Sequence, residues 1–309
     1  MSISYRLELP TTRVDDPAEF VSGQAVMEVA AAAEAAGFAG VHMTDHPAGD
    51  ARWLDAGGHH ALDPFVALSF AAAATRELRL LTYVYIAAYR NPFLGAKAVL
   101  SLDVLSGGRV TLDTAAGYLK SEFAALGVDF EERNDLFDEN LEVMKRAWSG
   151  DDVAYEGRHF TARGVRMRPT PVQQPHPPIW IGGNSTRSVR RAVESAQGWA
   201  PFSTFGYAQA SRTAEIDDVA QLAARIEGAR KYAAEIGRTE PLDVCFSGGP
   251  VADEDRPLAE RRTEAARLGD ARVTWIAVAL GGDDRRELLD RVARFGDEVV
   301  IDWAPGGAP

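Results

Sequence analysis

The chain has 309 residues, of which 46% are hydrophobic and 25% are charged, a composition typical of a globular enzyme. Its 33 basic and 45 acidic residues leave a net charge of −12, which argues against nucleic acid or an anionic membrane as the main partner. A chain of this length buries a large core without disulfides, and Cys245 is its single cysteine.

The beginning of the chain lacks the pattern of a secretory signal. Residues 1–6 contain no basic segment followed by an apolar core, as a signal peptide requires. The longest apolar stretch lies near Val66–Ala74, far shorter than the ~20 residues of a membrane-spanning helix. We therefore expect a cytoplasmic protein.

Strand-like and helix-like segments alternate along the first half of the chain. Apolar runs predict the first four strands, at Tyr5–Leu9, Gly40–Thr44, Leu78–Tyr85 and Arg109–Thr114. Helices are expected between them, over residues 24–36, 63–75 and 91–107. Asp63-Pro64 and Asn91-Pro92 each combine a capping side chain with proline at the first helical position.

The middle of the chain predicts one long helix and then an excursion. Within residues 131–149, Phe137, Leu141, Met144 and Trp148 recur at helical spacing, and we expect them to pack in the core. Residues 150–178 form the excursion between strands four and five, with a hairpin-like part over 153–160 and a stiff, proline-rich part from Pro169.

The alternation continues to the end of the chain. The last four predicted strands are Pro178–Ile181, Gly198–Phe202, Leu242–Phe246 and Arg272–Ala279. Helices are expected over residues 185–196, 216–236 and 283–295. The charged stretch around 253–256 is expected to be irregular, and the tail 303–309 to be frayed.

Eight strands, each followed by helix, predict a parallel α/β fold that closes into a (β/α)8 barrel. We expect residues 1–309 to form this TIM barrel as a single domain. A doubly wound open sheet is the rival, but it would usually show a Gly-rich turn after the first strand. The segment Pro10-Thr11-Thr12-Arg13 is not such a turn.

In a barrel the functional residues gather at the C-terminal ends of the strands. The second strand ends in Thr44-Asp45-His46, and a histidine there can donate or accept a proton near neutral pH; it could also merely cap a loop. His42 lies on the strand itself, and we expect it inside the barrel. His59-His60 is expected to lie in a loop.

A second candidate is the turn Gly182-Gly183-Asn184-Ser185, which follows the fifth strand and opens a helix. Backbone N–H groups at a helix N-terminus bind phosphate, although the same pattern also fits a plain N-cap after a tight turn. Too few His and Asp residues stand at strand ends for a metal-dependent hydrolase, and we expect no metal.

Together these segments resemble the luciferase-like flavin and deazaflavin oxidoreductases, above all the branch that uses coenzyme F420. The blocks that carry the resemblance span nearly the whole chain in order: residues 40–46, 78–82, 90–92, 105–110, 116–119, 122–127, 177–185, 198–199 and 272–275.

The resemblance implies roles for individual residues. Asp45 would contact the cofactor head, and His46 would lie next to the reacting ring carbon as the catalytic residue. A bulge with a cis non-proline peptide would fall at Tyr83-Val84, with Ile86 next along the ring. The remaining cofactor-binding residues would be Ala116, Gly117, Tyr118 and Ser121 after strand four, and Gly182, Gly183, Asn184 and Ser185 around the phosphate.

The chain also departs from the family pattern. Thr114-Ala115-Ala116-Gly117 stands where members often carry Gly-x-Gly, and Tyr118 stands where the sugar-phosphate dehydrogenases of the family carry Glu. The oxidation of glucose 6-phosphate is therefore disfavoured.

We expect an oxidoreductase that moves a hydride between coenzyme F420 and a small organic substrate, since the cofactor supplies the hydride chemistry and the protein orients it. An FMN-dependent monooxygenase on the same barrel is the first alternative, and a non-catalytic flavin- or deazaflavin-binding barrel is the second. We expect a homodimer with no nucleic-acid or membrane partner.

Overall fold

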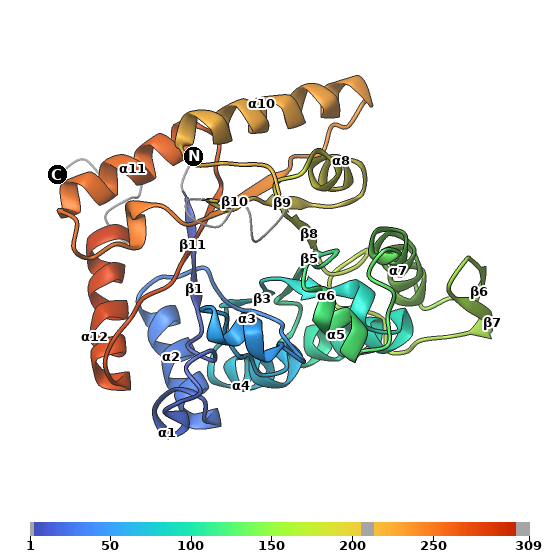
Figure 1. The fold of residues 1–309 in the computed structure, drawn as a ribbon, viewed down its shortest axis with the longest axis horizontal. Helices are drawn as coiled ribbons and strands as arrows, with labels where there is room; N and C mark the ends of the chain where they lie inside the picture. Colours follow the sequence, from blue (N-terminus) through green and yellow to red (C-terminus); the bar gives the residue numbers. More distant parts are fainter. Residues whose placement is uncertain (1–2, 205–212, 301–309) are drawn as a thin grey trace.

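The computed structural model describes residues 3–204 and 213–300. Its strands form a closed parallel barrel (Figure 1). The barrel strands are β1 Ser4–Glu8, β2 Gly40–Met43, β3 Arg79–Thr82, β5 Val110–Ala115, β8 Ile179–Gly182, β9 Gly198–Ala200, β10 Asp243–Ser247 and β11 Trp275–Val278. They are neighbours in the order β3-β2-β1-β11-β10-β9-β8-β5, and β3 pairs with β5 to close the ring. The predicted (β/α)8 barrel is confirmed.

Helices surround the barrel, with α10 and α11 on the edge opposite α4 and α5 in Figure 1. The longer helices are α2 Gly23–Ala35, α4 Pro64–Ala74, α5 Pro92–Ser106, α7 Arg133–Trp148, α8 Thr186–Ser195, α10 Val219–Glu235, α11 Leu258–Asp270 and α12 Arg285–Phe295. Shorter elements are α1 Pro17–Phe20, α3 Ala51–Asp55, α6 Lys120–Ala125 and turns at Ala87–Tyr89, Pro250–Ala252 and Gly296–Val300.

The local signals in the sequence act as expected at the helix ends. The Asp63 side chain accepts hydrogen bonds from two N–H groups in the first turn of α4, and Asn91 accepts one at the start of α5. Each such cap stabilises its helix by about 1 kcal/mol. Gly107 ends α5 with a φ of 71°, which is the left-handed conformation that favours glycine.

The apolar face predicted for the long middle helix is confirmed in α7. Phe137, Leu141, Met144 and Trp148 are all buried. After α7 the chain forms a separate two-stranded antiparallel sheet, from β6 Val153–Glu156 and β7 Thr161–Val165. This hairpin projects beyond α7 at one end of the molecule (Figure 1).

Three predictions about element boundaries were wrong. The stretch expected to be irregular after strand seven leads into α11, whose charged sequence hides a narrow buried face of Arg261, Ala265 and Leu268. The eighth strand begins at Trp275 rather than Arg272, because Arg272 adopts a φ of 70° that no strand accommodates. The tail 303–309 lies outside the described residues.

The third predicted strand is two strands. A cis peptide joins Tyr83 to Val84 between β3 and β4 Tyr85–Ile86, where the resemblance placed it. The short β4 then pairs with β5 at Thr114 and Ala115. The chain therefore bulges at the C-terminal mouth of the barrel.

The barrel interior is filled by large and polar side chains. Arg6 and Asp113 form a fully buried ion pair at 3.1 Å, and the Arg6 guanidinium lies 4.3 Å from the centre of the Tyr83 ring. His42 is 2% exposed and meets the same ring edge-on. The expectation that His42 lies inside the barrel is confirmed. Within the described residues, no helix is both long and apolar enough to cross a membrane.

Candidate active site

His46 lies just beyond the end of β2, at the C-terminal mouth of the barrel. Its side chain is only 9% exposed. The imidazole packs against Trp53, with ring centres 4.5 Å apart, and against His59 at 4.9 Å. The Tyr118 ring lies further out, at 6.3 Å. These rings shield His46 from water on several sides.

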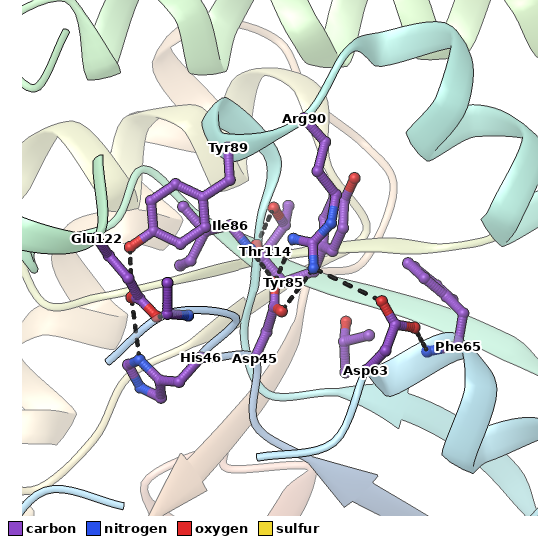
Figure 2. A network of polar contacts seen from close by, with 12 residues as sticks. Asp45, His46, Asp63, Phe65, Tyr85, Ile86, Tyr89, Arg90, Thr114 and Glu122 are labelled. Carbon is purple, nitrogen blue, oxygen red and sulfur yellow. Dashed lines mark hydrogen bonds and ion pairs between the residues drawn. The ribbon is translucent and has the colours of Figure 1, made fainter. Parts of the chain in front are cut away.

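Glu122 on α6 is the polar partner of His46. Its Oε2 atom lies 3.2 Å from His46 Nδ1 and accepts a hydrogen bond of 2.8 Å from the Tyr89 hydroxyl. Its Oε1 atom accepts one of 3.0 Å from the Ala48 N–H. Figure 2 shows the Glu122 carboxylate between Tyr89 and His46. Residues from three separate loops and helices thus converge on one carboxylate.

The carboxylate fixes how the histidine is protonated. Burial by itself raises the pKa of Glu122, but its hydrogen bonds and the nearby imidazole outweigh burial and hold that pKa below its ordinary value. Burial and the Glu122 carboxylate raise the pKa of Tyr89, so its phenol remains a donor. Because an ionised carboxylate only accepts hydrogen bonds, the proton of neutral His46 lies on Nδ1. Nε2 is then the ring atom left to exchange a proton with a ligand.

His59 is a neighbour of His46 but not its proton reservoir. Burial, reinforced by the positive charge that His46 can carry, lowers the pKa of His59 to about 4. His59 is therefore neutral at cytoplasmic pH, and its Nε2 lies 3.5 Å from the Thr44 hydroxyl. It contributes a wall to the site, in the loop where the sequence placed it.

Asp45 faces the bulge rather than open space. Its carboxylate accepts hydrogen bonds of 2.6 and 2.8 Å from the two terminal nitrogens of Arg90, and one of 3.2 Å from the Ile86 N–H. Burial opposes the charge of Arg90, but the bond to Asp45 outweighs it and raises the pKa of the guanidinium. Arg90 also approaches Asp63, at 3.8 Å (Figure 2). In this geometry Asp45 anchors the bulge through Ile86 and Arg90.

Small residues bring the backbone close to the bulge. A Cβ atom on Gly182 would lie 2.8 Å from Val84 Cγ1, and one on Gly117 would lie 2.8 Å from Ile86 Cγ2. Gly117 also has a φ of 84°, which L-residues rarely adopt. The structure therefore gathers four of the residues assigned from the resemblance on one side of the mouth.

The turn between β8 and α8 is tightly bonded. The Gly183 N–H donates to Ala200 O, and the Asn184 N–H donates to the Thr213 hydroxyl. The fully buried Asn184 side chain is hydrogen-bonded to the backbone of Phe202 and Ala214, so it holds two loops together.

Ser185 caps α8 by accepting from the Ser188 N–H. The first N–H groups inside the helix, at Thr186 and Arg187, have no acceptor within the helix.

The remaining assigned residues lie at the edge of this region. The Ser121 hydroxyl is hydrogen-bonded to the Asp50 carboxylate. Tyr118 is 40% exposed, and Ala116 is partly buried against the core. Within the described residues no group of three or more His, Cys, Asp or Glu side chains is placed to hold a metal ion.

Sequence reasoning missed Glu122, Tyr89 and Arg90 as site residues. Glu122 stood in a quoted block, but its role depends on contact with His46, 76 positions earlier. The only local signal was an acidic residue beside the apolar Phe123 in a short helix, which does not reveal a partner.

A parallel (β/α)8 barrel with a buried histidine–carboxylate pair at its C-terminal mouth is the architecture of an enzyme for small molecules. Residues 9–297 match the family described as Luciferase-like monooxygenase. The chain belongs to this family.

Two curated relatives illustrate its range. An uncharacterized protein of Mycobacterium tuberculosis is 28% identical over 289 residues, covering 89% of this chain and 95% of the relative. An FMNH2-dependent dimethylsulfone monooxygenase of Pseudomonas putida is 29% identical over 168 residues, covering 53% of this chain and 44% of that enzyme.

Solved structures show the same fold. Monooxygenase RslO1 from Streptomyces bottropensis has a TM-score of 0.79 at 22% identity, covering 98% of this chain and 100% of that one. The coenzyme F420-dependent tetrahydromethanopterin reductase from Methanopyrus kandleri has a TM-score of 0.72 at 16% identity, with the same coverage. Because these identities are low, the likeness concerns the fold alone.

Proposed function

We propose that the protein transfers a hydride between coenzyme F420 and a small organic substrate, with His46 exchanging the accompanying proton through Nε2. One observation carries the proposal: His46 is held by Glu122 with Nε2 left free, beside the bulge at Tyr83–Val84. A proton donor and acceptor with a pKa near ~6.5 serves both directions of such a reaction at neutral pH.

The residues around the bulge fit a planar cofactor head. Val84 and Ile86 present apolar side chains, and glycines at positions 117 and 182 allow the backbone to approach closely. When bound there, the deazaflavin ring donates or accepts the hydride in a single two-electron step. Asp45 and Arg90 would keep the bulge in place against it.

The start of α8 would hold the cofactor phosphate. Gly182 and Gly183 carry no side chain that could block an anion, and the N–H groups at the beginning of the helix point toward it with the favourable end of the helix dipole. Since the N–H groups of Gly183 and Asn184 are already bonded, Ser185 and the next two residues would donate to the phosphate.

An FMN-dependent monooxygenase is the second candidate, supported by the likeness to the FMNH2-dependent enzyme of Pseudomonas putida. Both cofactors carry a flat tricyclic ring and a phosphate, so the same cradle serves either. A non-catalytic flavin-binding barrel is less well supported, because cofactor storage gives no reason for a buried histidine–carboxylate pair.

Titration of the purified protein with F420 and with FMN, followed by fluorescence, tests the proposal. We expect F420 to bind at least about tenfold more tightly, a difference of about 1.4 kcal/mol. Equal affinities, or tighter binding of FMN, would overturn the assignment of F420 and favour the monooxygenase.

We further propose that residues 1–309 act as one domain in a cytoplasmic homodimer. Light scattering on the purified protein measures the oligomeric state. Limited proteolysis that released two separately stable halves would contradict the single domain.

A further inference from the structure

A second feature of the barrel mouth lies on the side away from the bulge. There the neighbouring strands β10, β11, β1 and β2 surround a cavity of about 240 Å³. Its polar lining comes from Glu8, His42 and Ser247, and the rest of the wall is apolar or glycine, as at Gly248 and Ala277. The volume suits a molecule of only a few heavy atoms.

His42 brings an unpaired polar atom to this cavity. The side chain is 2% exposed, and its Nδ1 atom has no hydrogen-bond partner among the described residues. Burial and the positive charge of Arg6 lower the pKa of His42 well below its ordinary value, so the ring is neutral. A buried polar atom without a partner costs about 1–3 kcal/mol, and such an atom in a native protein implies a partner that the chain itself does not supply.

The His42 ring is fixed in place. Tyr83 meets it edge-on at 5.1 Å, and Arg6 lies beneath Tyr83. Tyr83 is hydrogen-bonded across the mouth to Ser247 on β10. Because Tyr83 is also the first residue of the cis peptide, one side chain connects the cavity to the bulge where we place the cofactor ring.

Glu8 supplies the second polar group of the cavity. Glu8 and His42 are register partners on the adjacent strands β1 and β2, so their side chains are neighbours on the inner face of the barrel. Burial raises the pKa of Glu8, and the charge of Arg6 opposes that shift. A carboxyl group in this environment can both donate and accept a hydrogen bond near neutral pH.

The charge of the lining restricts what can bind. Among the described residues that line the cavity there is no lysine or arginine. The nearest buried cation, Arg6, is paired with Asp113. An anion such as a phosphate or a carboxylate would therefore lose its water and face Glu8 without compensation, which is unfavourable.

We propose that this cavity binds the polar end of a small, uncharged substrate, whose hydroxyl or carbonyl oxygen forms hydrogen bonds with His42 and Glu8. This inference rests on the proposed function, because it places the substrate on one side of the mouth and the cofactor on the other. It predicts a preference for alcohols and carbonyl compounds over organic acids and phosphate esters.

Ligand-observed NMR titration of the full-length protein, without cofactor, tests the inference directly. The probes share one six-membered ring and differ in the head group: cyclohexanol, cyclohexanone and cyclohexanecarboxylate. We expect the alcohol and the ketone to bind at least about tenfold more tightly than the acid, as expected for one unmatched buried charge or lost hydrogen bond. Tighter or equal binding of the acid, or binding of none of the probes, overturns the proposal.

Matched variants locate the binding. His42→Leu keeps an apolar side chain of similar size but removes Nδ1, and should weaken binding of cyclohexanol about tenfold. Ala277→Leu fills the cavity from β11 without touching His42, and should abolish binding even if the first variant is unstable. Glu131→Gln, on the exposed surface, is the control that should change nothing. Unchanged binding in both cavity variants refutes the site.

The proposal and the proposed function can fail separately. If the probes bind as expected but F420 does not, the cavity stands and the deazaflavin assignment falls. If F420 binds tightly but the probes ignore the cavity, the substrate site must lie elsewhere in the mouth.

Discussion

Replacing Glu122 by glutamine tests whether this carboxylate sets the protonation of His46. The two side chains have nearly the same shape, but an amide offers one acceptor oxygen instead of two. Glu122 is fully buried and accepts hydrogen bonds from His46, Ala48 and Tyr89 through both of its oxygens. In the variant the NH2 group must therefore face at least one of these donors.

Either orientation of the amide is costly. If its oxygen faces His46, the NH2 group opposes the Ala48 N–H, and a buried donor loses its partner. If its oxygen faces Ala48, the NH2 group points at His46, whose proton must move from Nδ1 to Nε2. Losing a hydrogen bond to a charged group, or leaving a buried donor unpaired, each costs about 1–3 kcal/mol. We expect Glu122→Gln to lower the free energy of unfolding by about 2–3 kcal/mol at pH 7.

The pH dependence follows from the direction of the shift. The pKa of Glu122 in the folded protein lies below its ordinary value of 4.5. Its stabilisation is therefore complete above that value and is lost as the pH falls through the folded-state pKa. The difference in stability between the parent protein and the variant should shrink in acid. Urea unfolding at pH 7 and pH 4 measures it.

Nitrogen NMR of the labelled histidines separates a role in protonation from a merely structural one. The chain has 6 histidines, and the His46→Ala spectrum identifies the His46 signals. We expect a protonated Nδ1 in the parent and a shift toward the Nε2-protonated form in Glu122→Gln. Hydride transfer should fall by about 10²–10⁴-fold, as for the loss of a general acid or base. Glu131→Gln, whose side chain is exposed, is the control. An unchanged His46 spectrum together with parental turnover would refute the reasoning.

Three further substitutions probe neighbouring parts of the site. His46→Ala should bind cofactor but lose about 10²–10⁴-fold in F420-coupled turnover; parental turnover in a cofactor-binding variant would leave His46 a packing residue. Gly183→Val should weaken cofactor binding, because the φ of 106° and the adjacent helix start leave no room for a side chain; unchanged affinity in the folded variant contradicts the phosphate site. Gly228→Ala, with open space around it in α10, is the control and should raise stability by about 0.5–1 kcal/mol. Arg90→Lys should loosen the bulge, since lysine cannot form the paired contact with Asp45; calorimetric titration should show weaker cofactor binding, and unchanged affinity would separate the bulge from the cofactor.

Local sequence determined most of the framework. Asp63-Pro64 and Asn91-Pro92 predicted helix starts that the structure confirms, because capping involves side chains and backbone groups within one turn. Alternating apolar runs predicted the eight strands, since burial between an inner and an outer layer leaves its mark along each segment. Helix α11 escaped because its buried face is narrow and partly charged, with Arg261 among its buried residues.

The site itself depended on closure of the barrel. Asp45-His46 could be singled out from the sequence because strand ends carry function in this architecture. Only tertiary structure decided that Glu122, 76 positions later, orients His46, and that Arg90 occupies both oxygens of Asp45. No pattern within a segment encodes such contacts, because the distance between strand ends and loops is set when the parallel strands join into a ring. The pairing of Glu8 with His42 on adjacent strands arises in the same way: their separation in the chain is large, and the register of the closed sheet makes them neighbours.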